Sequence, residues 1–67
     1  MPKRYSSAEL IRIIRKDGWY LVKVSGDHHK FKHPSKSGIV VLPHPLKDIP
    51  AGTAGAVLRQ AGIKERT

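Results

Sequence analysis

The sequence predicts an α+β fold in which one helix, three antiparallel strands and a second helix follow one another, with both helices on one face of the sheet. Apolar residues recur at helical spacing near both ends of the chain, whereas the middle alternates with period two. Short turn signals separate the alternating segments, as expected for neighbouring antiparallel strands. At 67 residues, the chain is expected to form one small domain, residues 1–67.

The first helix is predicted over residues 7–17. Ser6 and Glu9 have the spacing of a capping box, in which each residue bonds the backbone of the other. Gly18 follows the last helical residue, where a left-handed conformation commonly ends a helix. Between these signals, Leu10, Ile11 and Ile14 form an apolar stripe at helical spacing.

Three strands are predicted over residues 19–25, 28–33 and 39–42. Gly26 and Asp27 suit a two-residue hairpin turn, because glycine adopts a positive φ without steric cost. The third strand is a β-branched run that is too short for a helix, and the prolines after it are expected to end it.

The hairpin turn predicts a register in which Ser25 opposes His28, Lys23 opposes Lys30 and Val22 opposes Phe31. Directly opposed residues share a face of the sheet. The expected core face holds Tyr20, Val22, Val24, His29, Phe31 and His33. The expected open face holds Leu21, Lys23, Ser25, His28, Lys30 and Lys32. This register places His28 on a basic surface.

The second helix is predicted to begin near Pro50 and to stop at Gly62. Proline suits the first turn of a helix, where its missing N–H has no partner to lose. The apolar stripe of this helix consists of Ala54, Val57, Leu58 and Ala61. Its many small residues permit close approach to the sheet.

Thirteen Lys and Arg against five Asp and Glu give the chain a net charge of +8. An excess of this size predicts a polyanionic partner, nucleic acid first and an anionic membrane surface second. A charged surface that serves only solubility is the alternative. The membrane surface is disfavoured, because no basic amphipathic helix carries bulky aromatic residues.

The chain has no cysteine, so neither a disulfide nor a thiolate metal site is expected. No apolar run approaches the length of a membrane span, and the first residues lack the apolar segment of a secretory signal. We therefore expect a soluble, cytoplasmic protein.

The sequence contains neither a metal-binding pattern nor the motif of a catalytic serine nucleophile. His29 and His33 share a face, but four residues along a strand span about 13 Å, too far for one ion. No serine lies in a G-x-S-x-G elbow, and phosphate-loop and dinucleotide motifs are absent. We expect no metal and no cofactor.

His28 is the candidate catalytic residue. A histidine can accept or donate a proton near neutral pH, and RNA supplies its own nucleophile, the 2′-hydroxyl. Lys23, Lys30 and Lys32 on the same face could neutralise phosphate charge. The alternative is a surface histidine among solvated lysines.

The other histidines are expected to be structural. His29 and His33 should lie partly buried beside Phe31. His44, between two prolines, is expected to fix its loop, and a role in assisting the site is the alternative. Trp19 falls on the open face and is expected to cap the edge of the core rather than to stack on a partner.

Five segments in order resemble the HicA toxins of bacterial and archaeal HicA–HicB toxin–antitoxin systems, from about Ser6 to Ile63. They are Gly18-Trp19, Gly26-x-His28-His29-x-Phe31-x-His33-Pro34, Val41-Leu42-Pro43-His44-Pro45, Pro50-x-Gly52-Thr53 and Gln60-Ala61-Gly62-Ile63. The resemblance implies a fold like that of double-stranded-RNA-binding domains. It also implies the toxin of a type II system, a ribosome-independent mRNA interferase that a HicB antitoxin inhibits.

The family's catalytic histidine follows a Gly-Ser pair, which places that role on His28 and its glycine on Gly26. Many relatives carry serine where this chain has Asp27, so a negative charge stands beside the expected base. Two alternatives remain open at this point. One is a non-catalytic module that recognises RNA shape and phosphates through its lysines. The other is a regulatory protein that acts only through a protein partner.

Overall fold

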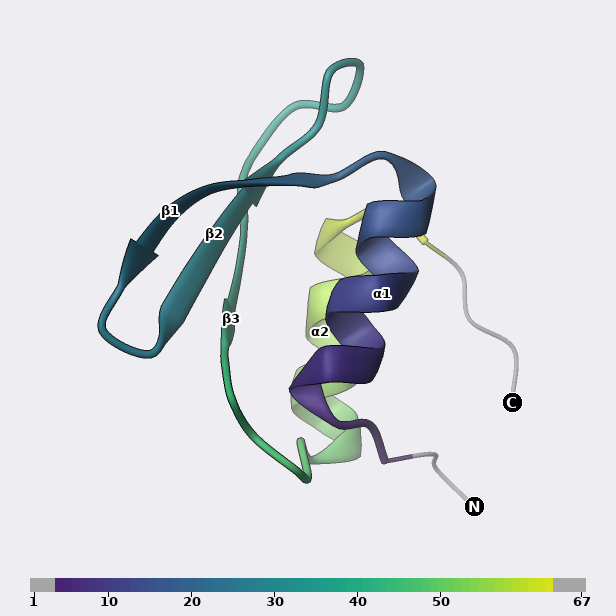
Figure 1. Ribbon diagram of the computed structural model, residues 1–67. Helices are drawn as coiled ribbons and strands as arrows, with labels where there is room; N and C mark the ends of the chain where they lie inside the picture. Colours follow the sequence, from purple (N-terminus) through teal and green to yellow (C-terminus); the bar gives the residue numbers. More distant parts are fainter. Residues whose placement is uncertain (1–3, 64–67) are drawn as a thin grey trace.

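The computed structural model describes residues 4–63 and has the predicted order of elements (Figure 1). They are α1 (Ser7–Asp17), β1 (Tyr20–Ser25), β2 (His28–Lys32), β3 (Val40–Pro43) and α2 (Ala51–Gln60). The three strands form an antiparallel sheet in the order β1-β2-β3, and both helices lie on one side of it. Among the described residues, no helix is long and apolar enough to cross a membrane.

The ends of α1 follow the local signals. Ser6 Oγ accepts the backbone N–H of Glu9 at 3.1 Å, and Glu9 Oε1 accepts that of Ser6 at 3.0 Å. Gly18 ends the helix with a φ of 116°, and its N–H donates to the carbonyl of Arg15. A Cβ on Gly18 would lie 2.6 Å from His33 Nε2, so both conformation and space require glycine here.

A β-bulge changes the predicted register of the first hairpin. Ser25 opposes His28 and Lys23 opposes Lys30, as predicted, but Leu21 rather than Val22 opposes Phe31. One extra residue on β1 reverses which side chains face the core beyond it. The predicted pairing of Val22 with Phe31 is therefore wrong.

The bulge accounts for the position of Trp19, which was expected on the open face. Its shift in parity turns Trp19 toward the helices, where only 2% of the residue is exposed and the indole Nε1 donates to the carbonyl of Ala61 at 3.2 Å. The same shift places Tyr20 opposite Lys32, on the face away from the helices. Burial of the large indole is a physical reason for the bulge.

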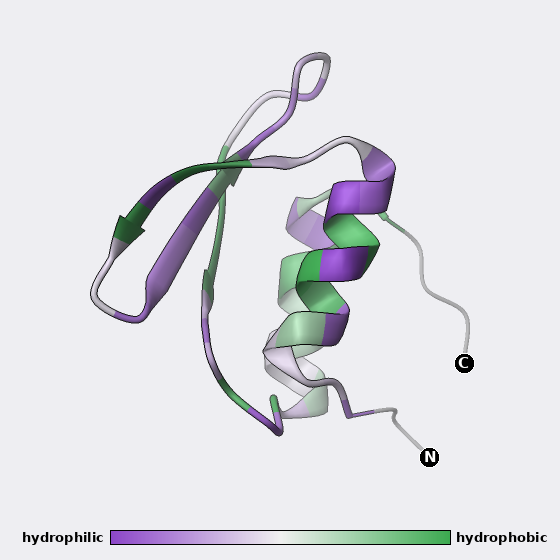
Figure 2. Ribbon diagram, viewed as in Figure 1, coloured by the Kyte–Doolittle hydropathy of each residue, from purple (hydrophilic) through white to green (hydrophobic). Residues whose placement is uncertain are grey.

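β1 lies at the edge of the sheet and is exposed along its whole length. Tyr20, Val22 and Val24 were expected on the core face, but they are 48%, 46% and 51% exposed. In Figure 1 the β1–β2 hairpin projects beyond the helices, and Figure 2 shows β1 as a largely apolar ribbon. The expectation of a buried face on β1 is wrong, because the helices cover β3 and part of β2 only.

The core forms between β2, β3 and the two helices. One cluster contains Ile14, Trp19, Phe31, Val40, Leu42, Val57 and Ala61. The second contains Tyr5, Leu10, Ile49, Ala54 and Leu58. The predicted apolar stripe of α2 is thus confirmed as buried.

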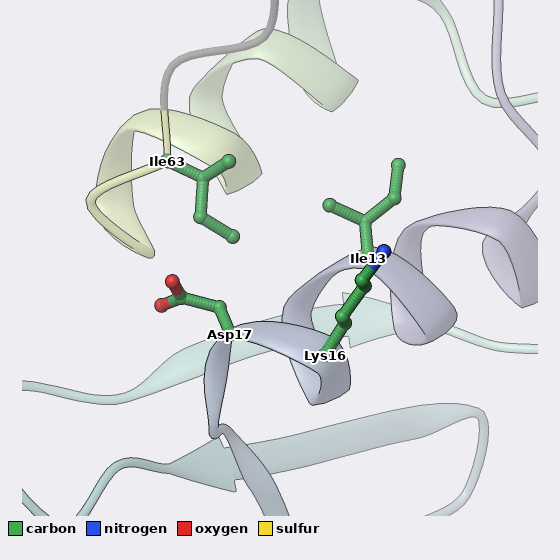
Figure 3. Close-up of a pocket in the computed structure, with 4 residues that line it drawn as sticks. All are labelled: Ile13, Lys16, Asp17 and Ile63. Atoms are coloured by element: carbon green, nitrogen blue, oxygen red, sulfur yellow. The ribbon is translucent and has the colours of Figure 1, made fainter.

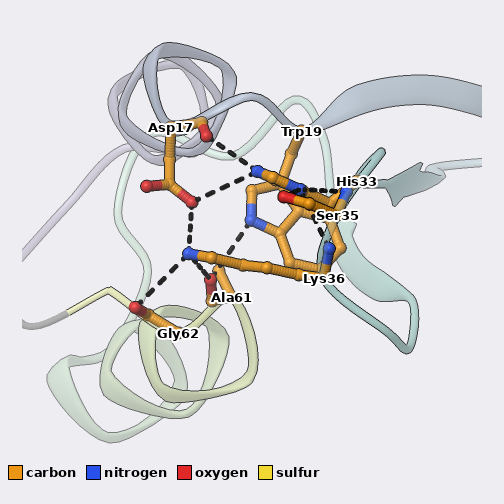
Figure 4. Close-up of polar contacts among 7 residues, drawn as sticks. All are labelled: Asp17, Trp19, His33, Ser35, Lys36, Ala61 and Gly62. Atoms are coloured by element: carbon orange, nitrogen blue, oxygen red, sulfur yellow. Dashed lines mark hydrogen bonds and ion pairs between the residues drawn. The ribbon is translucent and has the colours of Figure 1, made fainter.

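A polar network ties the ends of α1, β2 and α2 together (Figure 4). His33 Nδ1 accepts the backbone N–H groups of Ser35 and Lys36 at 3.0 and 3.1 Å, so its proton resides on Nε2, which donates to the carbonyl of Asp17 at 2.8 Å. Lys36 Nζ bonds Asp17 Oδ2 at 2.6 Å and the carbonyl of Ala61 at 3.0 Å. The Lys36 hydrogen bond lowers the pKa of Asp17. His33 has the structural role expected of it.

Candidate functional site

The outer face of the β1–β2 hairpin carries the predicted site. Phe31 is buried among residues of the helices, so its side chain marks the inner face of β2. Successive side chains of a strand alternate, so His28 and Lys30 point to the opposite, outer face. On that face Ser25 and Pro43 flank His28, whereas Lys23 and Val41 flank Lys30. The fold therefore brings His28, Lys23 and Lys30 together.

His28 opens β2, and its side chain is 61% exposed. Its Nδ1 lies 3.2 Å from Asp27 Oδ1. A carboxylate at this distance favours a proton on Nδ1, which leaves the lone pair of Nε2 available. The geometry thus offers a solvent-facing base whose orientation depends on its neighbour in the turn.

Gly26 makes the turn that precedes His28. It has a φ of 61°, and no residue other than glycine has a positive φ in the described part of the chain, a pattern that fits a type II′ turn. Apart from Gly26 and its two chain neighbours, no atom of the described residues lies within 4 Å of the position that a Cβ would take on Gly26. The backbone of the turn is consequently open to approach by a large ligand.

The lysines of the outer face have no acidic partner among residues 4–63. Lys23 and Lys30 are directly opposed, and like charges in this arrangement are unfavourable unless an anion comes between them. Lys32 lies on the same face, four residues from His28, or about 13 Å along the strand. Lys36, in contrast, is occupied by Asp17.

His44 lies on the helix side, away from the outer face. Its Nδ1 is 2.6 Å from Ser7 Oγ, and its ring packs against that of His29 with centroids 5.0 Å apart. The backbone N–H of His44 donates to the carbonyl of Asp27 at 2.8 Å. His44 fixes its loop, as expected, and its imidazole does not join that of His28.

Two comparisons with known proteins bear on this site. The sequence profile described as "HicA toxin of bacterial toxin-antitoxin" matches residues 7–63. The chain belongs to the HicA toxin family. A solved chain from the "HicA3 and HicB3 toxin-antitoxin complex" is 32% identical over 91% of this chain and 98% of that one, with a TM-score of 0.76. A search of curated proteins found no match.

In this HicA chain, sequence reasoning missed two contacts, one at His28 and one at His44. Asp27 was recognised as a charge, but its contact with Nδ1 depends on how the turn orients both side chains. Ser7 carried no signal, because it lies 37 residues from His44. A single hydrogen bond between residues this far apart, such as Ser7 and His44, leaves no recognisable pattern in the sequence.

A hollow of about 360 Å³ lies elsewhere on this HicA chain, at the end of α1 (Figure 3). It is lined by Ile13, Lys16, Asp17 and Ile63 and contains none of the predicted site residues. Among the described residues, no group of three His, Cys, Asp or Glu side chains could hold a metal ion.

Proposed function

We propose that this HicA toxin is an endoribonuclease, an mRNA interferase that cleaves mRNA and thereby arrests translation. His28 is its general base. In the reverse direction of the same proton transfer, the protonated His28 is the acid. The observation that carries the proposal is the exposed imidazole of His28 on the same sheet face as Lys23 and Lys30. The family resemblance supports the same residue.

RNA provides the nucleophile for this reaction. His28 Nε2 takes the proton of a 2′-hydroxyl, and the oxygen then attacks the adjacent phosphorus. The bond from phosphorus to the 5′-oxygen breaks, and that oxygen leaves with a proton from water. The products carry a 2′,3′-cyclic phosphate and a 5′-hydroxyl. A positioned base of this kind accelerates a reaction about 10²–10⁴-fold.

The lysines stabilise the charge that develops on the phosphate. Lys23 and Lys30 present two ammonium groups where the pentacoordinate phosphorus gains negative charge. Lys32 holds the RNA strand further along β2, and the open turn at Gly26 lets the backbone approach a phosphate. Tyr20, exposed opposite Lys32, offers a ring face on which a base can stack.

The proposed partner is an acidic HicB-like antitoxin that covers His28 and the lysines. The net charge of +8 favours fast association with an acidic protein. Val41 and Tyr20 expose apolar surface among these lysines, and such patches are typical of interaction sites. Masking of the outer face would keep RNA away from the base.

The test compares wild-type protein with His28→Ala in a cleavage assay on mRNA. The variant should lose about 10²–10⁴ in rate, whereas its unfolding midpoint and RNA affinity should change little. A substrate with a 2′-deoxy residue at the cut should resist the wild-type protein, and the products should end in 2′,3′-cyclic phosphates. Wild-type cleavage rates for His28→Ala, or normal cutting of the deoxy substrate, would show the mechanism to be wrong.

His33→Ala is the matched control, because it removes an imidazole that only joins structural elements. It should lower the unfolding midpoint and leave the rate of the folded protein nearly unchanged. The competing function is a non-catalytic RNA-binding module, which needs the lysines but not His28. Tight RNA binding by the wild-type protein without any cleavage would favour that module.

A further inference from the structure

A short chain of contacts connects the start of α1 to the turn that carries His28. The backbone N–H of His44 donates to the carbonyl of Asp27 at 2.8 Å. Asp27 directly precedes His28 and places a carboxylate oxygen 3.2 Å from its Nδ1. The position of His44 therefore sets the position of the backbone from which the His28 imidazole extends.

The side chain of His44 is anchored in turn by Ser7, the first residue of α1. Ser7 is 1% exposed, and its Oγ lies 2.6 Å from His44 Nδ1. Ser7 Oγ also accepts the N–H of Leu46 at 2.8 Å, and the N–H of Ser7 donates to the carbonyl of Leu46 at 2.8 Å. Ser7 thus holds the loop after β3 on both sides of Pro45.

The serine hydroxyl can serve either form of the His44 ring. It donates to Nδ1 when that nitrogen carries no proton. When Nδ1 is protonated, the hydroxyl turns its hydrogen to the carbonyl of Leu46, 3.1 Å away, and accepts from Nδ1 instead. The Ser7–His44 bond therefore forms with either tautomer of His44.

His29 completes the arrangement from the sheet. Its ring meets that of His44 edge to face, with an interplanar angle of 86°. His29 Nδ1 is buried and has no hydrogen-bond partner among the described residues. The imidazole of His29 thus serves as packing surface for His44, while its neighbour in the chain, His28, points to the other face.

We propose that His44 and Ser7 are positioning residues for the cleavage reaction: they hold the Asp27 turn, and through it the His28 imidazole, in register with the RNA. This inference rests on the proposed function. A misplacement of about 1 Å by a change away from the chemistry can reduce a rate about 100-fold. Loss of the Ser7–His44 bond should therefore lower kcat and leave RNA affinity, which depends on the lysines, nearly intact.

The test uses two substitutions of one residue. His44→Asn retains a polar atom at the δ position, which can bond Ser7 Oγ as Nδ1 does. His44→Gln carries its amide one carbon further out and cannot place it there. In single-turnover cleavage of mRNA, His44→Gln should be about 10- to 100-fold slower than the wild type, and His44→Asn should recover most of that loss.

Ser7→Ala repeats the test from the other side, since alanine suits a helix and removes only the hydroxyl. It carries the test alone if His44→Gln does not fold. Ser35→Ala changes a serine in the loop after β2; it is the control and should cleave at the wild-type rate. Cleavage is measured at a temperature well below the unfolding midpoint of each variant, so that all the protein is folded. A residue with a purely structural role would then leave the cleavage rate unchanged, whereas loss of a positioning residue would lower it.

The outcomes distinguish this inference from the proposed function. If the wild type cleaves RNA and both His44→Gln and Ser7→Ala match its kcat, positioning by this pair is wrong and the role of His28 stands. If His44→Asn is as slow as His44→Gln in folded protein, the δ atom is not what matters, and the inference also fails. If the wild type does not cleave, the proposed function itself is overturned.

Discussion

Lys23 and Lys30 lie directly opposite each other on the outer face of the β1–β2 hairpin, and no described carboxylate pairs with either. Directly opposed like charges weaken a sheet. An anion between the two ammonium groups relieves this repulsion, and the proposed function supplies one, a phosphate of the RNA substrate. The opposed pair therefore makes the RNA-binding proposal testable at a single residue.

Replacement of Lys30 by alanine should weaken RNA binding and reduce its salt dependence. Each phosphate contact releases about one counterion, so the slope of log K against log salt should fall by about one unit. Lys16→Ala is the control, since it removes the same charge from the last turn of α1, away from the hairpin. Titrations at several salt concentrations measure both slopes. Equal slopes for Lys30→Ala and the wild type would remove Lys30 from the RNA site.

Phe31 and Val22 should differ sharply in their effect on stability. Phe31 is 1% exposed in the main core cluster, so Phe31→Ala should lower the free energy of unfolding by about 3–5 kcal/mol. Val22 is the bulged residue and is 46% exposed, so Val22→Ala should change it by less than about 0.5 kcal/mol. Chemical denaturation measures both. A large loss of stability in Val22→Ala would show that Val22 faces the core, as the register without a bulge predicts.

Acid should weaken the network at the end of α1. The Lys36 hydrogen bond lowers the pKa of Asp17 from its ordinary value of 3.8. A carboxyl whose pKa is lowered by folding stabilises the protein above its unfolded pKa, and that contribution is lost as the pH falls through its folded pKa. Asp17→Asn should therefore be less stable than the wild type at pH 6, and the difference should shrink as the pH falls below the ordinary value of 3.8 and through the lowered pKa of the folded protein. A difference that persists in acid would contradict this account.

Most of the fold could be predicted because its signals are local. Ser6, Glu9 and Gly18 mark the ends of α1 through contacts with residues three or four positions away. The part of the site nearest the turn was predictable for the same reason. His28 and Lys30 are separated from Lys23 only by the Gly26 turn, so the alternation of the strands is sufficient to place them together.

The remaining features depend on contacts across the chain. No residue near Val22 signals a bulge, which follows from the burial of Trp19 against the end of α2. The exposure of β1 depends on how far the helices extend over the sheet, a property of packing rather than of alternation. The bond between Ser7 and His44 joins residues that lie far apart in sequence. Each of these required the assembled structure.

The proposed antitoxin can be mapped with two substitutions of nearly equal exposure. Val41 is 39% exposed and lies opposite Lys30 on the outer face. Leu46 is 44% exposed, and its backbone N–H and carbonyl bond Ser7 at the start of α1, away from the outer face. A glutamate at position 41 would face an acidic partner across the interface, and like charges placed together disfavour binding.

Val41→Glu should therefore weaken the complex with the proposed acidic HicB-like antitoxin by at least about tenfold, whereas Leu46→Glu should bind nearly as the wild type does. Both variants have the same net charge, so a difference between them reports location rather than overall electrostatics. Calorimetric titration of the purified pair measures the two affinities. Equal binding by both variants would show that the antitoxin docks away from the outer face, and inhibition would then have to reach His28 from a distance.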